Sequence, residues 1–249
     1  MSRLTVGLVL GLLLTVSLLV AAPARLLALV LPAERVLLQG FDGSLWRGTV
    51  SRCLVRTGAG YLHLGRVAWQ LDPISLVTLA PRLSIESQWG RQRIAGDLVL
   101  HGGQDFDLFD VEATVAADLV RQFAPLALGG SLNGTFERIA VRDGLPVRAE
   151  GRLVWQNGAW ESPQGLLPLG TYAADIVTLD RGSLSGEVLT LSGPVPAQGV
   201  AALEGRAYSV DVLVGGERAL DPQIQRALPL IATPEGERYR IRLEGEIGG

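Results

Sequence analysis

The sequence predicts a mainly β protein: an N-terminal transmembrane helix followed by an elongated, curved antiparallel β-sheet body with an internal duplication and a few short helices. Three observations lead to this fold class. The stretch Leu4–Ala22 carries no charged residue, whereas apolar and polar residues alternate along much of the chain that follows. Turn-forming Gly, Pro, Asn and Asp residues interrupt that alternation about every 8–12 residues, as expected for many short strands.

The membrane anchor is expected within residues 1–31. A helix over Leu4–Ala22 would be ~28 Å long, close to the hydrocarbon thickness of a bilayer. The alternative is a signal peptide cleaved near Ala22-Pro23-Ala24, where small residues stand in suitable places. A proline lies between those residues, and the mature chain would then begin with the apolar run Leu26–Leu31. These features favour an uncleaved anchor, with the long body translocated out of the cytoplasm.

Composition excludes several classes of function. The formal net charge is -3, which argues against nucleic acid binding, because nucleic acid requires a basic surface. Cys53 is the only cysteine, so we expect neither an intrachain disulfide nor a cysteine-based metal site. The 31 glycines occur without a low-complexity run, and 48% of residues are hydrophobic. This combination favours tight turns between strands over disorder.

The body begins with a predicted antiparallel hairpin. Alternation over Leu45–Arg56 and over Tyr61–Leu71 predicts two strands, with Gly58-Ala59-Gly60 as the turn between them. Asp72-Pro73 then supplies an N-cap and a proline at the first helical position. A short helix is therefore expected over Ile74–Leu79.

Strand signals continue to the end of the chain. The further predicted strands are Arg82–Trp89, Gln92–His101, Asp107–Val115, Ser131–Arg142, Val147–Gln156, Ala173–Leu179, Gly186–Leu191, Gly199–Val214 and Arg238–Ile247. Short helices are expected over Leu119–Phe123 and Gln223–Leu228. Asn157-Gly158 is predicted to form a hairpin turn, because both residues tolerate positive φ.

An internal repeat divides the body. The segment 43–49, Gly-Ser-Leu-Trp-Arg-Gly-Thr, returns at 130–135 as Gly-Ser-Leu-Asn-Gly-Thr. Each copy is followed by a Gly-Arg-x-x-Trp-Gln segment, at 65–70 and at 151–156. Such repeats predict duplicated supersecondary units. The expected units are 32–128 and 129–249, either separate or joined in one continuous β-domain.

The sequence lacks the residue sets that carry catalysis. A hydrolase needs an activated nucleophile beside a base, yet His63 and His101 both lie in strand patterns and are better explained as sheet side chains. The segment 182–186 has leucine where a nucleophile elbow needs serine. The chain has no lysine for a P-loop and no zinc-binding His or Cys motif. We therefore expect no enzyme activity, no cofactor and no metal site.

One acidic run is a candidate cation site. It comprises Asp105, Asp107, Asp110 and Glu112. Closely spaced carboxylates can bind calcium. However, the alternation with Phe106 and Leu108 predicts a strand whose acids face water and whose apolar residues face inward, and this second interpretation is favoured.

The candidate structural or partner-contact residues are tryptophans. They are Trp46, Trp69, Trp89, Trp155 and Trp160. Aromatic rings in a groove stack on sugars or line a path for lipid. Rings also cover the gaps that glycines leave in a sheet, and this core role is the favoured interpretation.

Two ordered groups of residues carry a resemblance to a known family. The first is Gly40-Phe41-Asp42-Gly43-Ser44-Leu45-Trp46-Arg47-Gly48 followed by Leu64-Gly65-Arg66-Val67-Ala68-Trp69-Gln70-Leu71-Asp72-Pro73. The second runs from Gly151 to Ala159 and continues through Leu169-Gly170 to the segment 228–245. Together they resemble the type II secretion system protein N (general secretion pathway protein N) family, which pairs a G-T/S-L-W-x-G turn with a later W-x-L-x-P. Cys53 and the run Leu26–Leu31 depart from the pattern.

The resemblance implies an inner-membrane, single-pass accessory subunit of the machine that exports folded proteins from the periplasm. Its body would lie in the periplasm, and the family defines no catalytic residues. Expected partners are the membrane and other inner-membrane or secretin components, bound through a groove or by strand addition at sheet edges. The alternative is an AsmA-like lipid-handling β-groove protein of the cell envelope. A metal-independent glycosidase acting on envelope sugars is a third and weaker interpretation.

Overall fold

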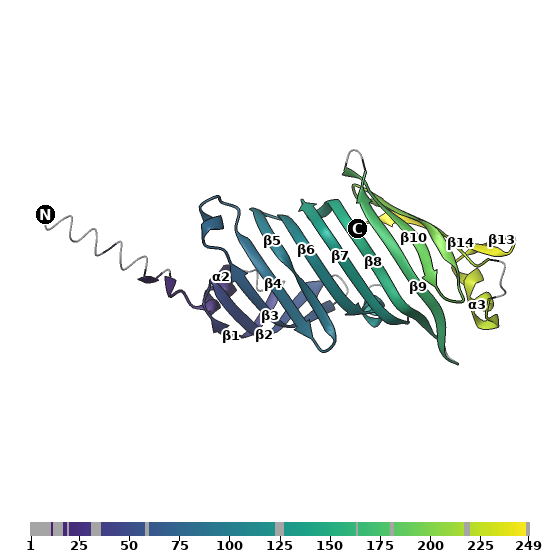
Figure 1. The fold of residues 1–249 in the computed structure, drawn as a ribbon, viewed down its shortest axis with the longest axis horizontal. Helices are drawn as coiled ribbons and strands as arrows, with labels where there is room; N and C mark the ends of the chain where they lie inside the picture. The colour runs from purple at the N-terminus through teal and green to yellow at the C-terminus, as the bar shows by residue number, and fades with distance from the viewer. Residues whose placement is uncertain are drawn as a thin grey trace, which may run out of the picture. The chain divides into compact units, whose positions relative to one another are not determined.

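The structure, a computed structural model, describes residues 11, 17–18, 20–30, 36–57, 60–122, 127–162, 164–179, 182–216 and 220–247. In these residues the chain is mainly β, as predicted, with antiparallel strands and a few short helices (Figure 1). Most of the predicted anchor over Leu4–Ala22 lies outside them. The described residues include no helical segment with both the length and the hydropathy that spanning a bilayer requires. The elongated, curved form of the body stays a prediction.

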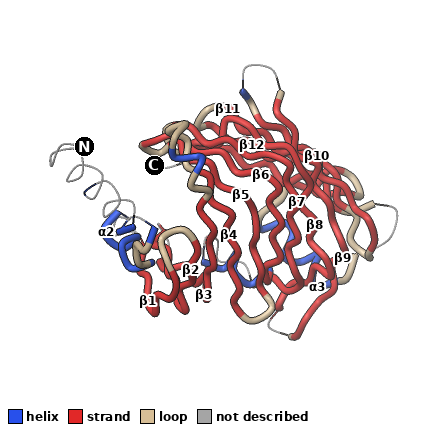
Figure 2. The backbone as a smooth tube through the Cα atoms, turned by 60° about the vertical axis from the view of Figure 1, so that its left-hand side comes forward, coloured by secondary structure: helices blue, strands red, loops and turns tan. Residues whose placement is uncertain are grey.

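The chain divides into two compact units, Met1–Trp89 and Gly90–Gly249. Figure 2 shows how little helix accompanies the strands of either unit. The division expected from the sequence repeat, 32–128 and 129–249, stays a prediction, because a boundary set by packing does not test for duplication.

In the first unit, antiparallel strands follow one another in sequence order. They are β1 (Val36–Gly43), β2 (Arg47–Thr57), β3 (Gly60–Leu71) and β4 (Arg82–Trp89). The predicted hairpin is present as β2 and β3, and the next predicted strand is present as β4. The sequence did not predict β1, because Gly40 and Gly43 break its alternation with φ values of 70° and 87°.

Short helical segments frame these strands. They are η1 (Ala24–Leu26), α2 (Leu27–Val30) and η2 (Ile74–Leu76). The predicted helix after Asp72-Pro73 is thus a single 3₁₀ turn, begun by the Asp72 carboxylate, which accepts the backbone N–H of Ile74 at 3.0 Å. The end of the predicted anchor helix contacts this unit, since Leu45, in the bend before β2, donates its backbone N–H to the Ala22 carbonyl oxygen at 2.8 Å.

The core of the first unit lies between η1 and the β2–β3 hairpin. Ala24, Val50, Cys53 and Trp69 form one buried cluster. Burial raises the pKa of the Cys53 thiol, so this cysteine is an unreactive packing residue. Fully burying a valine side chain such as that of Val50, which is 1% exposed, stabilises a fold by about 1.5–3 kcal/mol.

The strands of the second unit also neighbour one another in chain order, except that β14 lies between β12 and β13. They are β5 (Gln92–Gly102), β6 (Asp105–Ala116), β7 (Leu128–Arg142), β8 (Leu145–Ser162), β9 (Gly165–Thr178), β10 (Leu184–Ser192), β11 (Ala197–Glu204), β12 (Ala207–Val214), β13 (Thr233–Glu235) and β14 (Arg238–Glu246). Its helical segments are η3 (Ala117–Gln122), α3 (Pro222–Ala227) and η5 (Leu228–Leu230). Each copy of the sequence repeat therefore lies on its own pair of neighbouring strands, β2 and β3 in the first unit and β7 and β8 in the second.

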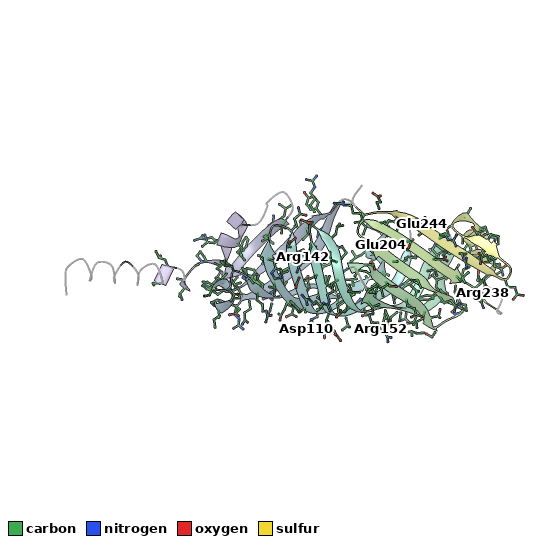
Figure 3. All side chains as sticks on the ribbon, turned by 90° about the horizontal axis from the view of Figure 1, so that it is seen from above. Asp110, Arg142, Arg152, Glu204, Arg238 and Glu244 are labelled. Carbon is green, nitrogen blue, oxygen red and sulfur yellow. The ribbon has the colours of Figure 1, made fainter. Side chains whose placement is uncertain are left out.

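Strands β8 to β12 and β14 present two faces of opposite character. One row of directly opposed residues is Arg152, Asp175, Glu187, Val200, Asp211 and Arg242. The row one residue further along is Leu153, Ala174, Val188, Gly199, Val212 and Ile241. Directly opposed side chains share a face, and successive residues alternate between faces. We call the first the charged face, to which Arg152 and Glu244 belong (Figure 3), and the second the apolar face.

Helix α3 covers one end of the apolar face (Figure 1). Ile224 and Leu228 are buried with Val195 and Val214, and half-buried strand residues, Val212 among them, pack against this cluster. The helix begins as its sequence predicts. The carboxylate of Asp221 accepts the backbone N–H of Gln223 at 2.8 Å, and Pro222 occupies the first helical position.

The predicted hairpin turn at Asn157-Gly158 is wrong. Asn157 does adopt a positive φ, 49°, but it forms an irregularity inside β8, where the register with β9 shifts. The strand continues to Ser162, so β9 begins at Gly165 and not near Ala173. A residue that tolerates positive φ serves a bulge as readily as a turn.

The single long strand predicted over Gly199–Val214 is also wrong. The segment forms two strands, β11 and β12, which pair from Ala197 opposite Val214 to Glu204 opposite Ala207. Gly205, with a φ of 59°, makes the turn between them. Its neighbours Glu204 and Arg206 are both polar, so the alternation of polar and non-polar residues continues across the turn and does not mark it in the sequence.

Candidate functional site

Two of the five candidate tryptophans form equivalent hydrogen bonds in the two copies of the repeat. Trp69 lies in β3, is 7% exposed and donates its indole Nε1–H to the carbonyl oxygen of Leu45 at 3.0 Å. Trp155 lies in β8 and donates the same group to the carbonyl oxygen of Gly129, also at 3.0 Å. Each ring therefore joins its own strand to the beginning of the hairpin partner.

Both rings cover glycines. A Cβ on Gly48 would lie 2.5 Å from Cζ2 of Trp69, and a Cβ on Gly158 would lie 2.9 Å from Trp155. The Trp155 ring also lies 5.5 Å from the ring of Tyr172, whose burial raises its pKa to about 12. This packing suits the core role expected of these residues; contact with a partner protein stays a prediction.

The other three tryptophans occupy different environments. Trp89 ends β4, is 51% exposed and places its ring 5.9 Å from that of His63. Trp46 is half-buried in the bend before β2, and its carbonyl accepts the backbone N–H of Leu71 at 2.7 Å. Trp160 is half-buried in β8. Among the five, Trp89 offers the most ring surface to a partner.

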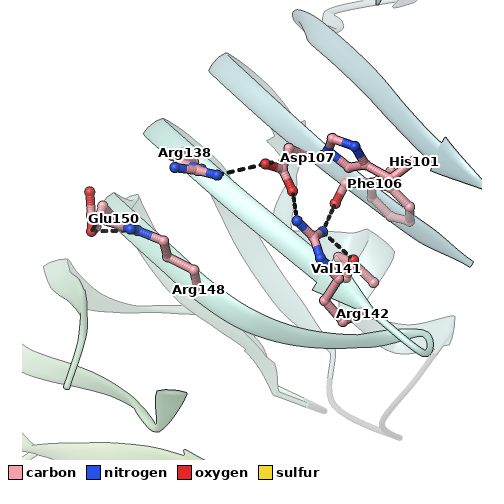
Figure 4. Close-up of polar contacts among 8 residues, drawn as sticks. All are labelled: His101, Phe106, Asp107, Arg138, Val141, Arg142, Arg148 and Glu150. Atoms are coloured by element: carbon pink, nitrogen blue, oxygen red, sulfur yellow. Dashed lines mark hydrogen bonds and ion pairs between the residues drawn. The ribbon is translucent and has the colours of Figure 1, made fainter. Parts of the chain in front are cut away.

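A buried carboxylate sits in an arginine-rich cluster on β6 and β7 (Figure 4). Asp107 is 3% exposed. Its Oδ2 lies 2.7 Å from Nη2 of Arg138, and its Oδ1 lies 2.6 Å from Nη2 of Arg142. Nε2 of His101, on β5, is 3.7 Å from Oδ2. Arg142 also donates from Nη1 to the carbonyl oxygen of Phe106 at 3.1 Å.

The prediction that Asp107 faces water is therefore wrong. Its strand face carries charge, but the two long arginine side chains from β7 cover it. Burial alone would raise the pKa of Asp107; the hydrogen bonds and charges of Arg138 and Arg142 outweigh burial and hold this pKa below its ordinary value. Phe106 and Leu108 are half-buried on the opposite face.

This cluster can stabilise the sheet, but it does not suit cation binding. The two guanidinium groups contact both carboxylate oxygens and repel a cation. Among the described residues, no group of three or more His, Cys, Asp or Glu side chains is arranged to hold a metal ion. The Arg138 guanidinium also lies 5.3 Å from the Phe109 ring centre, so the ring helps to hold it in place.

The apolar face is the more extensive candidate for a binding surface. Beyond the end that α3 covers, Ile176, Val188 and Val210 are half-buried, and Leu243 is 52% exposed. These aliphatic side chains come from β9, β10, β12 and β14, and Ala201 of β11 lies opposite Val210 on the same face, so they form one continuous surface. Such a surface suits an apolar segment of a partner or an acyl chain.

Comparison with known proteins decides among the families that this fold allows. The family model described as type II secretion system (T2SS), protein N matches residues 34–242. The chain belongs to this family. The type II secretion system protein N of Aeromonas hydrophila is 29% identical over 240 residues, covering 92% of this chain and 93% of the relative. No solved structure matches the chain.

Two further members of the protein N family have similar relationships to the chain. The protein of Klebsiella pneumoniae is 29% identical over 216 residues, covering 82% of this chain and 81% of the relative. That of Vibrio cholerae serotype O1 is 26% identical over 258 residues, covering 97% of each. The resemblance noted from the tryptophan-containing motifs is thus confirmed.

Proposed function

We propose that the chain is an accessory, structural subunit of the type II secretion system, which exports folded proteins from the periplasm. The uncharged stretch Leu4–Ala22, within the anchor expected over residues 1–31, would hold it in the inner membrane by a single pass, with the β body in the periplasm. The match to the protein N family over residues 34–242 carries this proposal, because it extends through both units. The uncharged stretch Leu4–Ala22 supports the anchor.

A sheet with two such faces suits a protein that binds other proteins and catalyses no reaction. Water solvates the Arg, Asp and Glu side chains of the charged face, where Arg152 and Asp175 form a 2.7 Å ion-pair hydrogen bond. The apolar face offers aliphatic surface that water solvates poorly. We propose that inner-membrane or secretin components of the apparatus bind the apolar face or the strand edges.

The placement in the envelope is tested by fractionation and protease accessibility. The full-length chain should sediment with inner membranes, and protease should digest the β body in spheroplasts but not in intact cells. The chain, purified after cross-linking in cells, should carry other secretion subunits with it. A chain found free in the cytosol, or purified without any secretion subunit, would contradict the proposal.

A second candidate, the binding of envelope lipid, is favoured by one observation: the apolar face keeps half-exposed aliphatic side chains beyond the area that α3 covers. Native mass spectrometry of the full-length protein would detect bound phospholipid. Val210→Asp would place a charge on the apolar face and should abolish binding. Ser209→Asp, one residue away on the charged face, is the matched control. A wild-type protein without lipid would exclude this candidate and leave the secretion role untouched.

A further inference from the structure

The outer edge of β14 is open over most of its length. On one side β14 pairs with β12 from Tyr239 to Glu246. On the other side β13 pairs with it only opposite Arg238–Arg240. No other described strand neighbours β14. Residues 241–246 therefore present a strand edge of the kind that pairs with another chain.

One hydrogen bond establishes which backbone groups point outward. Ile247 donates its backbone N–H to the carbonyl oxygen of Arg206 at 2.8 Å, directly before β12. Backbone groups alternate in direction along an antiparallel strand. The odd-numbered residues of β14 therefore point toward β12, and the even-numbered residues point outward. In the open stretch these are Arg242, Glu244 and Glu246.

The side chains of this edge alternate in charge and polarity. Arg242 and Glu244 are exposed and lie on the charged face, where Arg242 is 3.2 Å from Oδ2 of Asp211. Leu243 lies between them on the apolar face and is 52% exposed. The edge thus offers a positive and a negative side chain on either side of an exposed leucine.

Antiparallel pairing of this edge with a second copy of itself is favourable in one register. Outward-pointing residues must oppose one another. Centring the pair on Arg242 or on Glu244 would oppose identical charges, and centring it on Gly245 would oppose Glu244 and Glu246. Like charges directly opposed destabilise a strand pair. Centring it on Leu243 sets each Arg242 opposite Glu244 of the second copy. Registers centred nearer the beginning of β14 are blocked, because β13 already pairs with Arg238–Arg240.

We infer that two copies of the chain associate through β14 in this register, as a two-fold symmetric dimer with Leu243 at the axis. Two ion pairs between Arg242 and Glu244 flank a leucine–leucine contact. Each Arg242–Glu244 pair exchanges two backbone hydrogen bonds, whereas the Leu243–Leu243 pair between them exchanges none. The same patch serves both copies, so the pairing closes and does not propagate into a filament. This inference stands apart from the proposed secretion role.

The contact involves about five residues on each chain, far fewer than the roughly 20–30 residues a side of a standard protein interface. The association is therefore weak, and a covalent trap is the suitable measurement. Cys53 is the only cysteine of the sequence, so Cys53→Ala gives a background free of other thiols.

Disulfide trapping of the full-length chain in cells tests the register. At a pair without direct hydrogen bonds the Cα atoms lie about 4.5 Å apart, within the ~4.4–6.8 Å range of disulfides. Leu243→Cys should therefore give several-fold more trapped dimer than Arg242→Cys or Glu244→Cys, each of which faces a different residue. Chains carrying Arg242→Cys and chains carrying Glu244→Cys should form a mixed dimer when produced together.

Charge reversal in the Leu243→Cys background separates specific pairing from collision. Glu244→Arg would place an arginine opposite Arg242 in both residue pairs and should lower the yield of trapped dimer several-fold. Glu246→Arg is the matched control, because the position it would face is closed by β13, and trapping should not change. Equal trapping at 242, 243 and 244, or no trapped dimer from a Leu243→Cys chain with wild-type abundance and circular dichroism, would overturn the inference. An equal loss from Glu246→Arg would overturn it as well.

Discussion

The indole of Trp69 donates a hydrogen bond of 3.0 Å to the main-chain carbonyl of Leu45. Beside it, the backbone N–H of Leu71 donates to the carbonyl of Trp46 at 2.7 Å. These two bonds join the Gly-x-Leu-Trp-x-Gly turn to the later tryptophan strand. The two halves of the motif that resembles the protein N family are therefore one structural unit, and its residues stabilise the fold.

Replacing Trp69 by phenylalanine should weaken this unit. Trp69→Phe keeps most of the buried ring but loses the bond to Leu45, which costs about 0.5–1.5 kcal/mol. Urea unfolding of the full-length protein, followed by far-ultraviolet circular dichroism, measures the change. Trp89→Phe, at a ring that is 51% exposed, should shift the free energy of unfolding by less than ~0.5 kcal/mol. Equal effects of the two substitutions would argue against a structural role for the indole bond.

A side chain at Gly48 should disturb the same contact. A Cβ there would lie 2.5 Å from Trp69 and 2.8 Å from the carbonyl oxygens of Asp42 and Ser44. Gly48→Ala should therefore lower the free energy of unfolding by about 1–3 kcal/mol. The control is Gly186→Ala, whose Cβ would meet nothing closer than 3.7 Å and should be close to neutral. A Gly48→Ala protein as stable as the wild type would show that the ring is free to move.

The cluster around Asp107 should make stability depend on acid. The folded-state pKa of Asp107 is lowered, so its contribution to stability is fully present above the ordinary aspartate pKa, about 4, and is lost as the pH falls from there through the lowered folded-state pKa. Asp107→Asn should cost ~1–3 kcal/mol at neutral pH, less than for a fully buried pair because the Arg138 and Arg142 side chains are 36% exposed.

Urea unfolding of both proteins at neutral pH and near pH 3 checks this prediction. The difference between wild type and Asp107→Asn should shrink in acid, as protonation removes the same interaction. Asp110→Asn, an isosteric change at an exposed carboxylate of the same strand, is the control and should have little effect. A difference that does not change with pH would refute the assigned role of the carboxylate.

The bulge at Asn157 makes a conformational prediction. Its φ of 49° suits glycine and asparagine but strains a β-branched residue. Asn157→Val should lower the free energy of unfolding by about 1–2 kcal/mol, whereas Asn157→Gly should stay within ~1 kcal/mol of the wild type. Gln156→Val tests for a general effect of valine at the preceding exposed position. Thermal unfolding of the three variants measures these changes. An equal loss of stability from Asn157→Val and Gln156→Val would exclude a special backbone conformation at Asn157.

The sequence reveals much of this fold because the alternation of apolar and polar residues is strong. It predicts β2, β3, β4 and the start of α3, where Asp221 and Pro222 give an explicit signal. It fails where one signal serves two geometries. Positive φ at Asn157 produced a bulge and not a turn, and Gly205 turned the chain between strands whose alternation is continuous across it.

The candidate site was harder to predict, because its features depend on pairing between strands. The burial of Asp107 depends on Arg138 and Arg142, which lie more than thirty residues later. They reach Asp107 only because the register of β6 and β7 places Ala140, which lies between them, opposite it. The apolar face likewise becomes continuous only when β8 to β12 and β14 are aligned. Within single strands the local signal is alternation, as of Val210, Val212 and Val214 in β12.

The most direct test of the account is the export of a type II substrate in a strain that lacks this chain. We predict that the substrate accumulates in the periplasm and that the full-length chain restores its release into the medium, while a resident periplasmic protein is unaffected. Normal release of the substrate without the chain, in a strain that depends on this pathway, would contradict the proposed role in secretion.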